Sequence, residues 1–550
     1  MWAGGAHRNV NDDDFGSRYD GSTTECLPSM VVGPLSQGKP MAELDRRARS
    51  TATTDTDSPG TERATVAETH SAYVLLIGPR AFKMKKAVQN DFLDFSTVDA
   101  RRVALEREYT LNVRFSPDVY LGIAELTDPG GGPPEPLLKM HRLPESRKLA
   151  TLAVSGADVT EDLVSIAHIV AQVHARSAHD DTIDRAGSRD ALRGRWAANI
   201  RELRAFPTPI VDAATIDDID ERSARYLAGR GPLFDRRIAQ HRIVDGHGDL
   251  LADDIFCMSD RPRILDCLDF DDELRYLDGI DDICCLAMDL EFLGRPKAAR
   301  SLIDAYLEAA CDAPPGSLVD HYIAYRATVR AKVACIRALQ CGATSSADAT
   351  EHARSASRHL EAATVTATLI GGLPGTGKST VAAEYASRTG ASVLSSDVVR
   401  KELAGLDPSE ARPSAVGEGL YSPSVTAHTY AELLRRAREL LAAGRSVVLD
   451  ATWTDPDMRE RARLLAARAR AESIEIECTV PPLTSLQRIA TRRSSASDAT
   501  RQVYESMARG RAPWPSARRV SCGGTVAESV DAALTIRSEA IHRCSRSPRQ

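Results

Sequence analysis

An eight-residue glycine-rich segment carries the clearest chemical signal in this sequence. It reads GLPGTGKS at residues 372–379 and follows the apolar run 364–370, which predicts a buried strand that ends at a turn. This is the spacing of the Walker A motif, in which backbone N–H groups and the start of a helix bind a polyphosphate. A helix should therefore begin near Lys378, which would bridge the β and γ phosphates while Ser379 holds Mg²⁺.

The motif predicts that nine consecutive residues bind the cofactors ATP and Mg²⁺. These are Gly372, Leu373, Pro374, Gly375, Thr376, Gly377, Lys378, Ser379 and Thr380. A glycine-rich turn can be purely structural, but the complete signature between a strand and a helix favours nucleotide binding.

Charged residues follow two later strands of the same region. Asp397 and Arg400 stand three apart at the end of the predicted strand 391–400, where α/β sheets place their ligands. The run 445–453 predicts a Walker B-like strand that brings Asp450 near the water shell of Mg²⁺.

The spacing of Asp397 and Arg400 resembles that of P-loop kinases of the polynucleotide-kinase and gluconate-kinase kind. The resemblance implies that Asp397 deprotonates an acceptor hydroxyl, which Arg400 orients. The segment RIATRR at 488–493 resembles the lid of the same kinases, whose arginines neutralise the moving phosphoryl group. A solvated basic helix is the alternative. The arginines concerned are Arg488, Arg492 and Arg493.

A second informative stretch spans residues 241–291. Two short apolar runs, 255–258 and 264–265, flank a polar turn, with Asp249 before the first and Asp266 after the second. Carboxylates at the ends of adjacent strands can hold Mg²⁺ and accept a hydroxyl proton, as phosphoryl transfer requires. Acidic surface loops are the alternative interpretation.

HGDL at 247–250 and ILD at 264–266, with Asp278 and Asp282 downstream, resemble the catalytic segment of aminoglycoside phosphotransferases, which have a eukaryotic-kinase-like fold. The resemblance implies a catalytic base and two metal ligands. These are Asp249 as the base, Asp266 as a metal ligand, and Asp254 where that family has a metal-binding asparagine.

Further upstream, residues 73–86 predict a hairpin, and alternation places Lys83 and Lys85 on one face of its second strand. A solvated edge strand is the alternative. The same resemblance implies that one of these lysines binds the nucleotide, with Glu106 of the predicted helix 98–112 as its partner. Spacing does not choose between the two lysines, and no glycine-rich loop precedes the hairpin.

ETHSAYVLL, FLDFSTVDARR, HGDL and the Walker A motif occur in the order seen in the bacterial bifunctional aminoglycoside phosphotransferase/ATP-binding proteins, which residues 63 to about 518 resemble. The resemblance implies an α+β protein-kinase-like domain followed by an α/β P-loop kinase domain with a parallel sheet. Each domain would transfer the γ-phosphoryl group of ATP to a hydroxyl of a small molecule, such as a sugar or an aminoglycoside-like acceptor. The alternative is an ATP-binding regulatory protein with one or both domains non-catalytic, which Asp254 and the absent glycine-rich loop favour for the first domain.

The composition and the motifs divide the chain into five segments. They are a disordered tail (1–62), a kinase-like domain (63–345), a linker (346–362), a P-loop kinase domain (363–520) and a polar C-terminal tail (521–550). The two centres stand about 130 residues apart across that linker, so we expect separate cores.

The composition also limits the partners and the compartment. The 550 residues are 43% hydrophobic and 27% charged, and no apolar run is long enough to span a bilayer. The net charge of −7 argues against bulk attraction to nucleic acid. The first residues lack an apolar secretory core and the eleven cysteines form no CxxC pair, which together indicate a cytoplasmic protein with reduced thiols. No signal points to a particular oligomeric state.

Overall fold

The computed structural model describes residues 65–68, 72–88, 94–127, 132–206, 210–407, 419–491 and 500–544. Nearly all of the tail predicted over 1–62 and the ends of several loops therefore lie outside the described residues. No helix in these ranges is long and apolar enough to cross a membrane.

The first lobe, hereafter the small lobe, is built on an antiparallel sheet. Its elements are β1 (Thr65–Glu68), β2 (Ala72–Ile77), β3 (Arg80–Lys85), α2 (Val98–Asn112), β4 (Tyr120–Leu126) and β5 (Glu135–His141). The strands lie in the order β1-β2-β3-β5-β4, and α2 packs against β4 and β5. The predicted hairpin is present as β2 and β3, whose tight turn places Gly78 at a φ of 51°.

The second lobe, hereafter the helical lobe, is mainly helical and contains four short strands among its described residues. In chain order its elements are η1 (Glu145–Arg147), α3 (Leu149–Ser155), α4 (Thr160–His174), α5 (Asp181–Ala186), α6 (Arg189–Ala205), α7 (Ala213–Gly229), α8 (Gly231–Ala239), β6 (Ile243–Asp245), η2 (Ala252–Asp254), β7 (Ile255–Cys257), β8 (Pro262–Ile264), β9 (Tyr276–Asp278), α9 (Gly279–Phe292), α10 (Pro296–Ala309), α11 (Gly316–Gln340) and α12 (Ala347–Ala362). Strand β6 pairs with β9 and β7 pairs with β8, so the two hairpin-like pairs hold the loop with Asp249 and the turn with Asp266.

The C-terminal domain is an α/β sandwich. Its elements are β10 (Thr366–Gly371), α13 (Lys378–Thr389), β11 (Ser392–Ser395), α14 (Ser396–Leu403), η3 (Gly419–Tyr421), α15 (Pro423–Ala442), β12 (Val447–Asp450), α16 (Pro456–Arg468), β13 (Glu472–Thr479), α17 (Pro482–Thr491), α18 (Arg501–Gly510), β14 (Arg518–Ser521) and α19 (Val526–Cys544). The five strands are all parallel, in the order β11-β12-β10-β13-β14. Every residue of the central strand β10 is buried, as its continuous apolar run predicts.

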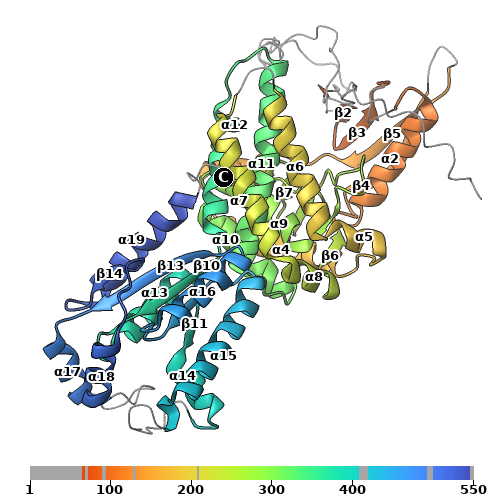
Figure 1. Ribbon diagram of the computed structural model, residues 1–550. Coiled ribbons are helices and arrows are strands. Elements are labelled where there is room, and N and C mark those ends of the chain that lie inside the picture. The colour runs from red at the N-terminus through yellow and green to blue at the C-terminus, as the bar shows by residue number, and fades with distance from the viewer. Residues whose placement is uncertain are drawn as a thin grey trace, which may run out of the picture.

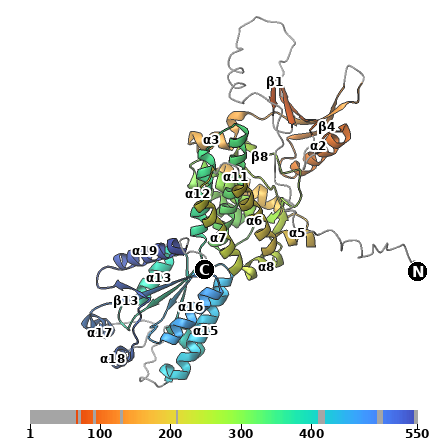
Figure 2. The ribbon, with the colours of Figure 1, turned by 45° about the horizontal axis from the view of Figure 1, so that its top comes forward.

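The small lobe and the C-terminal domain lie at opposite ends of the helical lobe (Figures 1 and 2). In the C-terminal domain, α13 and α19 pack together, and α15 packs with α16. The molecule has the predicted fold class: an α+β protein-kinase-like domain followed by an α/β P-loop domain with a parallel sheet.

The linker predicted over 346–362 is wrong, because this segment is the helix α12. Its buried residues are Ala349, Ala353, Ala356 and Leu360 together with polar His352 and Ser355, and the helix packs against α11 and α7. Alanines at helical spacing bury a narrow stripe, which a reading based on small and polar composition does not detect.

The polar tail predicted over 521–550 is wrong for most of its length. Residues 526–544 form α19, which packs on α13 and β13. Its buried side chains include Val530, Ala533, Ile536 and Ile541, a helical stripe interrupted by arginine, serine and glutamate.

The expected separation into two cores also fails. One continuous cluster of buried apolar side chains runs from Tyr322 of α11 through Leu360 of α12 and Val365 to Leu369 of β10. The helical lobe and the parallel sheet therefore share one core, because α12 leads directly into the first strand of the sheet.

Candidate functional site

The glycine-rich segment 372–379, hereafter the P-loop, forms a closed turn between β10 and α13. Gly372 has a φ of 143° and Gly375 a φ of 79°. A Cβ atom at Gly372 would lie 2.6 Å from the carbonyl oxygen of Cys478, and one at Gly375 would lie 2.5 Å from that of Ser485. Both positions therefore require glycine, because the loop lies directly on the backbone of β13 and α17.

Lys378, Ser379 and Asp450 meet where the P-loop enters α13. Lys378 is the first residue of α13 and Asp450 the last of β12, so both lie at the carboxyl edge of the parallel sheet. Asp450 forms side-chain hydrogen bonds with Ser379 and Ser395, whereas its Oδ1 is buried without a hydrogen-bond partner. Burial raises the pKa of Asp450, and the charge of Lys378 opposes that rise. A buried carboxylate oxygen beside a hydroxyl group fits the ligand set of a hydrated Mg²⁺.

Asp397 and Arg400 lie in the first two turns of α14 and form an ion pair with an O–N distance of 2.6 Å. The guanidinium of Arg400 also lies over the ring of Tyr421, 4.8 Å from its centroid. Both charged residues line a cavity of ≈ 310 Å³ that Lys378 also lines. The strand predicted over 391–400 is shorter in the structure, because α14 begins before Asp397. A carboxylate, a guanidinium and an ammonium group thus surround one cavity.

A second cavity, of ≈ 230 Å³, borders the P-loop at α17 and the segment after β14. Arg488 donates to the carbonyl oxygen of Cys522 at 2.9 Å and to that of Thr376 at 3.5 Å. A Cβ atom at Gly377 would lie 3.5 Å from Nη1 of Arg488. The structure therefore places Arg488 at the wall of a P-loop cavity, whereas Arg492 and its neighbour lie outside the described residues.

In the small lobe, Lys83 and Lys85 both pair with Glu108 of α2, at 2.7 and 2.9 Å. The predicted partner, Glu106, is exposed, so that assignment is wrong. The buried face of α2 carries Leu105, Glu108, Leu111 and Asn112 at helical spacing, and Glu106 lies off this face. That spacing is a sequence signal that could have identified Glu108.

Lys83 is the lysine that reaches the helical lobe's acidic segment, since its Nζ lies 3.1 Å from Oδ1 of Asp266. Burial alone would lower the pKa of Lys83, but Glu108 and Asp266 outweigh it and raise that pKa well above its ordinary value. Lys85 is more deeply buried and pairs instead with Asp269 at 2.9 Å. The two lysines therefore differ in position, and Lys83 faces Asp266.

Asp282 of α9 accepts hydrogen bonds from the segment 246–250, hereafter the HGD loop. The backbone N–H groups of His247 and Gly248 donate to Asp282 at 2.6 and 3.0 Å. Burial alone would raise the pKa of Asp282, but hydrogen bonding to His174 and the charges around it hold that pKa below its ordinary value. The carbonyl of Gly248 accepts from Arg326 of α11 at 2.7 Å. Sequence reasoning did not identify this support by His174 and Arg326.

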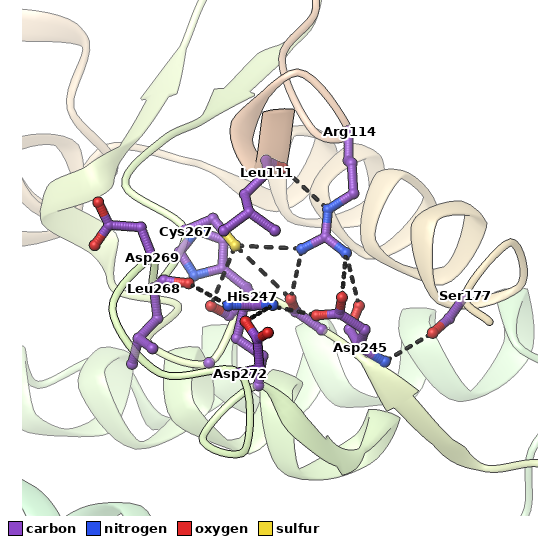
Figure 3. Close-up of polar contacts among 12 residues, drawn as sticks. Leu111, Arg114, Ser177, Asp245, His247, Cys267, Leu268, Asp269 and Asp272 are labelled. Carbon is purple, nitrogen blue, oxygen red and sulfur yellow. Dashed lines mark hydrogen bonds and ion pairs between the residues drawn. The ribbon is translucent and has the colours of Figure 1, made fainter. Parts of the chain in front are cut away.

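Arg114 follows α2 and connects the small lobe to the HGD loop (Figure 3). Its guanidinium donates to the carbonyl oxygens of Asp245 and Gly246 at 3.1 and 3.0 Å, and it lies 3.4 Å from Sγ of Cys267. Asp266, which precedes Cys267 in the chain, has a φ of 62°. This conformation costs free energy in a residue other than glycine and is common at functional sites. The Asp266 turn and the HGD loop are thus held by one arginine.

Three carboxylates approach one another at this site. Burial, Asp266 and Asp249 raise the pKa of Asp254 to about 8. Lys83 lowers the pKa of Asp266. Within the described ranges, no group of three or more His, Cys, Asp or Glu side chains is arranged to hold a metal ion. Asp254 and Asp266 are therefore electrostatically coupled without forming a ready-made metal cage.

The predicted site residues thus form two centres. The first centre lies at the junction of the small lobe and the helical lobe. It contains Asp249, Asp254, Asp266 and Lys83, and Lys85 is more deeply buried beside it. The P-loop, Asp397, Arg400, Asp450 and Arg488 lie at the carboxyl edge of the parallel sheet.

Some known proteins are similar to one part of the chain, and others are similar to most of it. The AAA domain family matches residues 368–514. A choline/ethanolamine kinase family protein from Mesorhizobium loti aligns at a TM-score of 0.35 and 14% identity, over 59% of this chain and 95% of that one. A gluconokinase from Sinorhizobium meliloti 1021 aligns at a TM-score of 0.26 and 15% identity, over 32% of this chain and 95% of that one.

A longer match extends through both centres. The uncharacterized protein Rv2004c of Mycobacterium tuberculosis is 44% identical over 476 residues, which cover 86% of this chain and 96% of the relative. An alignment of this length and identity shows common ancestry of the whole two-part arrangement. The chain therefore belongs to the family of this mycobacterial protein.

Proposed function

We propose that the chain is an ATP-dependent phosphotransferase with two centres, each of which transfers the γ-phosphoryl group of ATP to a hydroxyl of a small molecule. The observation that carries the proposal is the cavity of ≈ 310 Å³ lined by Lys378, Asp397 and Arg400. It joins a phosphate-binding lysine to a carboxylate that can accept a proton, and these are the parts that transfer to a hydroxyl needs.

At the second centre, the backbone N–H groups of the P-loop and Lys378 bind the polyphosphate of ATP. Ser379 and Asp450 would hold Mg²⁺, whose charge offsets that of the β and γ phosphates. Asp397 accepts the proton of the acceptor hydroxyl, and Arg400 orients both Asp397 and the acceptor. Arg488 supplies positive charge at the opposite wall of the P-loop.

At the first centre, Asp249 accepts the hydroxyl proton. Lys83, fixed by Glu108, binds the phosphates of ATP, and Asp266 with Asp254 would hold Mg²⁺. The raised pKa of Asp254 fits this role, because a divalent cation between the two coupled carboxylates would relieve their repulsion. The acceptors of both centres are proposed to be sugars or aminoglycoside-like molecules.

A second candidate function is ATP binding without transfer at the first centre. It is favoured by the same group, since an Asp254 that stays protonated near pH 7 binds metal weakly. In that case the kinase-like domain would regulate the P-loop domain through the shared core.

The test compares Asp249→Asn with Asp397→Asn, which keep the shape of each residue but remove the base. Release of ADP is measured against a library of hydroxyl compounds. We expect Asp249→Asn to abolish turnover of one acceptor class while the other persists, and Asp397→Asn to do the reverse. Asp271→Asn and Asp457→Asn, on exposed surface, are the matched controls and should change neither.

Three outcomes would contradict the proposal. If either catalytic substitution silences both activities in a folded protein, the two centres are one composite site. If no acceptor depends on Asp249, the regulatory function of the first domain is favoured. If no compound stimulates ADP release by the unaltered chain, transfer to small hydroxyl compounds is wrong.

A further inference from the structure

Cys478 and Cys522 face each other at the wall of the P-loop cavity. Cys478 lies in β13 opposite Val520 of β14, and Cys522 lies two residues beyond Val520, so both side chains project from one face of the sheet. They are only 1% and 5% exposed, each thiol interacts with the other strongly enough to shift its pKa, and Sγ of Cys522 also donates to the carbonyl oxygen of Val520 at 3.7 Å. Two sulfur atoms thus meet in a buried position that the proposed transfer reaction does not use.

Both cysteines are in contact with the P-loop. The carbonyl oxygen of Cys478 lies under Gly372, where a Cβ atom would come within 2.6 Å of it. Cβ of Cys522 would lie 3.6 Å from a Cβ atom at Gly377, and its carbonyl oxygen accepts from Arg488. Cys522 also lines the cavity of ≈ 230 Å³, so small reagents can reach it from solvent.

The surroundings favour the thiolate form of Cys522. Hydrogen bonding by Cys478, joined by Ser529 and the charge of Arg488, outweighs burial and lowers the pKa of Cys522 to about 7. The proton stays on Cys478, because its interaction with Cys522 and its burial raise the pKa of Cys478. The charge of Lys378 opposes this rise, and that of Asp450 adds to it. A thiolate at neutral pH that a cavity exposes is the reactive form of cysteine.

We propose that Cys522 is a covalent-modification site of the P-loop cavity, which a small peroxide converts into a disulfide with Cys478. The Cys522 thiolate attacks one oxygen of hydrogen peroxide, breaking the O–O bond and forming a sulfenic acid; the departing hydroxide takes a proton and leaves as water. The sulfur of Cys478 then attacks the sulfur of Cys522, the S–O bond breaks, and the Cys478 proton leaves with the hydroxide as a second water. Two thiols are oxidised and one peroxide is reduced.

The disulfide would reshape the nucleotide site. Two sulfur atoms in non-covalent contact must approach to about 2.05 Å to form a disulfide. Closing the bond therefore draws Cys522 toward β13, which is feasible because β14 is the edge strand of its sheet. The movement displaces the carbonyl that anchors Arg488 and narrows the space beside Gly377. ATP affinity at the P-loop should fall, a consequence that rests on the proposed nucleotide binding.

The first experiment measures alkylation of each cysteine in the full chain by iodoacetamide, followed by peptide mass spectrometry. We expect Cys522 to react with a midpoint near pH 7, and exposed Cys311 serves as the comparison thiol in the same sample. In Cys478→Ala the midpoint of Cys522 should rise toward 8.5, whereas Cys335→Ala, which removes a buried thiol of α11, should leave it unchanged. ATP at 100 times its Kd should slow alkylation of Cys522 up to about 100-fold and leave Cys311 unaffected.

The second experiment treats the reduced chain with hydrogen peroxide and maps disulfides without reduction. We expect a Cys478–Cys522 linkage and at least a tenfold weaker binding of a fluorescent ATP analogue at the P-loop, both reversed by dithiothreitol and absent in Cys522→Ser. A midpoint for Cys522 near 8.5 in the unaltered chain, or peroxide treatment that leaves both thiols free, overturns the proposal. If the analogue fails to bind the reduced chain, nucleotide binding is wrong, while the midpoint and the linkage still decide the modification.

Discussion

Glu108 is the side chain on which the charge balance of the small lobe depends. It is 2% exposed and contacts both Lys83 and Lys85, so one carboxylate accepts from one half-buried and one buried ammonium group. Glu106, two residues earlier, is exposed. Buried charges are tolerated only when they are paired, so the two glutamates should differ sharply in their effect on stability.

We expect Glu108→Gln to destabilise the small lobe by about 3 kcal/mol, because it leaves two lysines without a full counter-charge. Glu106→Gln is the matched control and should change the free energy of unfolding by less than about 0.5 kcal/mol. Urea unfolding of the two variants, with hydrogen exchange of the β2–β3 amides to locate the effect, checks the prediction. Equal stability of the two variants would contradict the ion-pair assignment.

Lys378 is also buried, and we propose that its amino group serves a ligand rather than the core. Replacing it with alanine should remove one of two ATP-binding events in a calorimetric titration, since a charged hydrogen bond to phosphate contributes about 1.5–3 kcal/mol. The melting temperature should stay close to that of the unaltered chain. Two unchanged binding events would show that the P-loop lysine does not bind ATP.

At the scale of elements, α12 is attached to the helical lobe through a half-buried histidine. His359 lies 2.7 Å from Glu291 of α9 and 2.9 Å from Asp320 of α11. Burial alone would lower the pKa of His359, but hydrogen bonds to Asp320 and Glu291 raise it to about 9. The imidazolium thus connects three helices at the point where the chain passes toward the parallel sheet.

This raised pKa makes the attachment of α12 dependent on pH. A histidine with a folded-state pKa near 9 and an unfolded value near 6.5 contributes on the order of 3 kcal/mol below pH 6.5 and loses it as the pH rises through 9. His359→Gln should therefore lower the melting temperature most at pH 6 and hardly at all above pH 9.5. His168→Gln, an exposed replacement on α4, should have little effect at either pH. A deficit that does not change with pH would argue against the charged state of His359.

For the whole molecule, a close contact between the ends of α7 and α16 adds to the shared core in joining the two domains. Arg230 donates to the carbonyl oxygen of Ala469, at the end of α16, at 2.7 Å. Ser317 of α11 donates to the carbonyl oxygen of Gly444 at 2.6 Å. A Cβ atom on Gly229 would fall on the carbonyl oxygen of Ala469, so the helices approach too closely for any larger residue.

Gly229→Val should force the two helix ends apart and destabilise the interface by about 1–3 kcal/mol. Calorimetry should then resolve the helical lobe and the parallel-sheet domain as two transitions, and small-angle scattering should show a larger radius of gyration. Gly194→Val is the matched control, because a Cβ atom there meets nothing within 4 Å. A single unchanged transition in Gly229→Val would mean that the interface yields without cost.

The sequence by itself determined the two candidate site segments and the order of the two folds. GLPGTGKS specifies a closed P-loop turn because glycines at fixed spacing can adopt positive φ angles, and that information is local. The placement of Asp450 at the end of β12, and of Asp266 and Asp397 shortly after β8 and β11, likewise followed from apolar runs and the acidic residues that border them. The hairpin lysines followed from alternation along β3.

Only the tertiary structure decided which groups serve as partners. Glu108 rather than Glu106 faces the lysines because a helix turns about 100° per residue, and the docking of α2 on the sheet selects one face. The support of the HGD loop by Asp282, and of Asp282 by His174, joins residues far apart in the chain. Helices α12 and α19 escaped prediction because their buried stripes are narrow, so their helical state depends on the surfaces they cover.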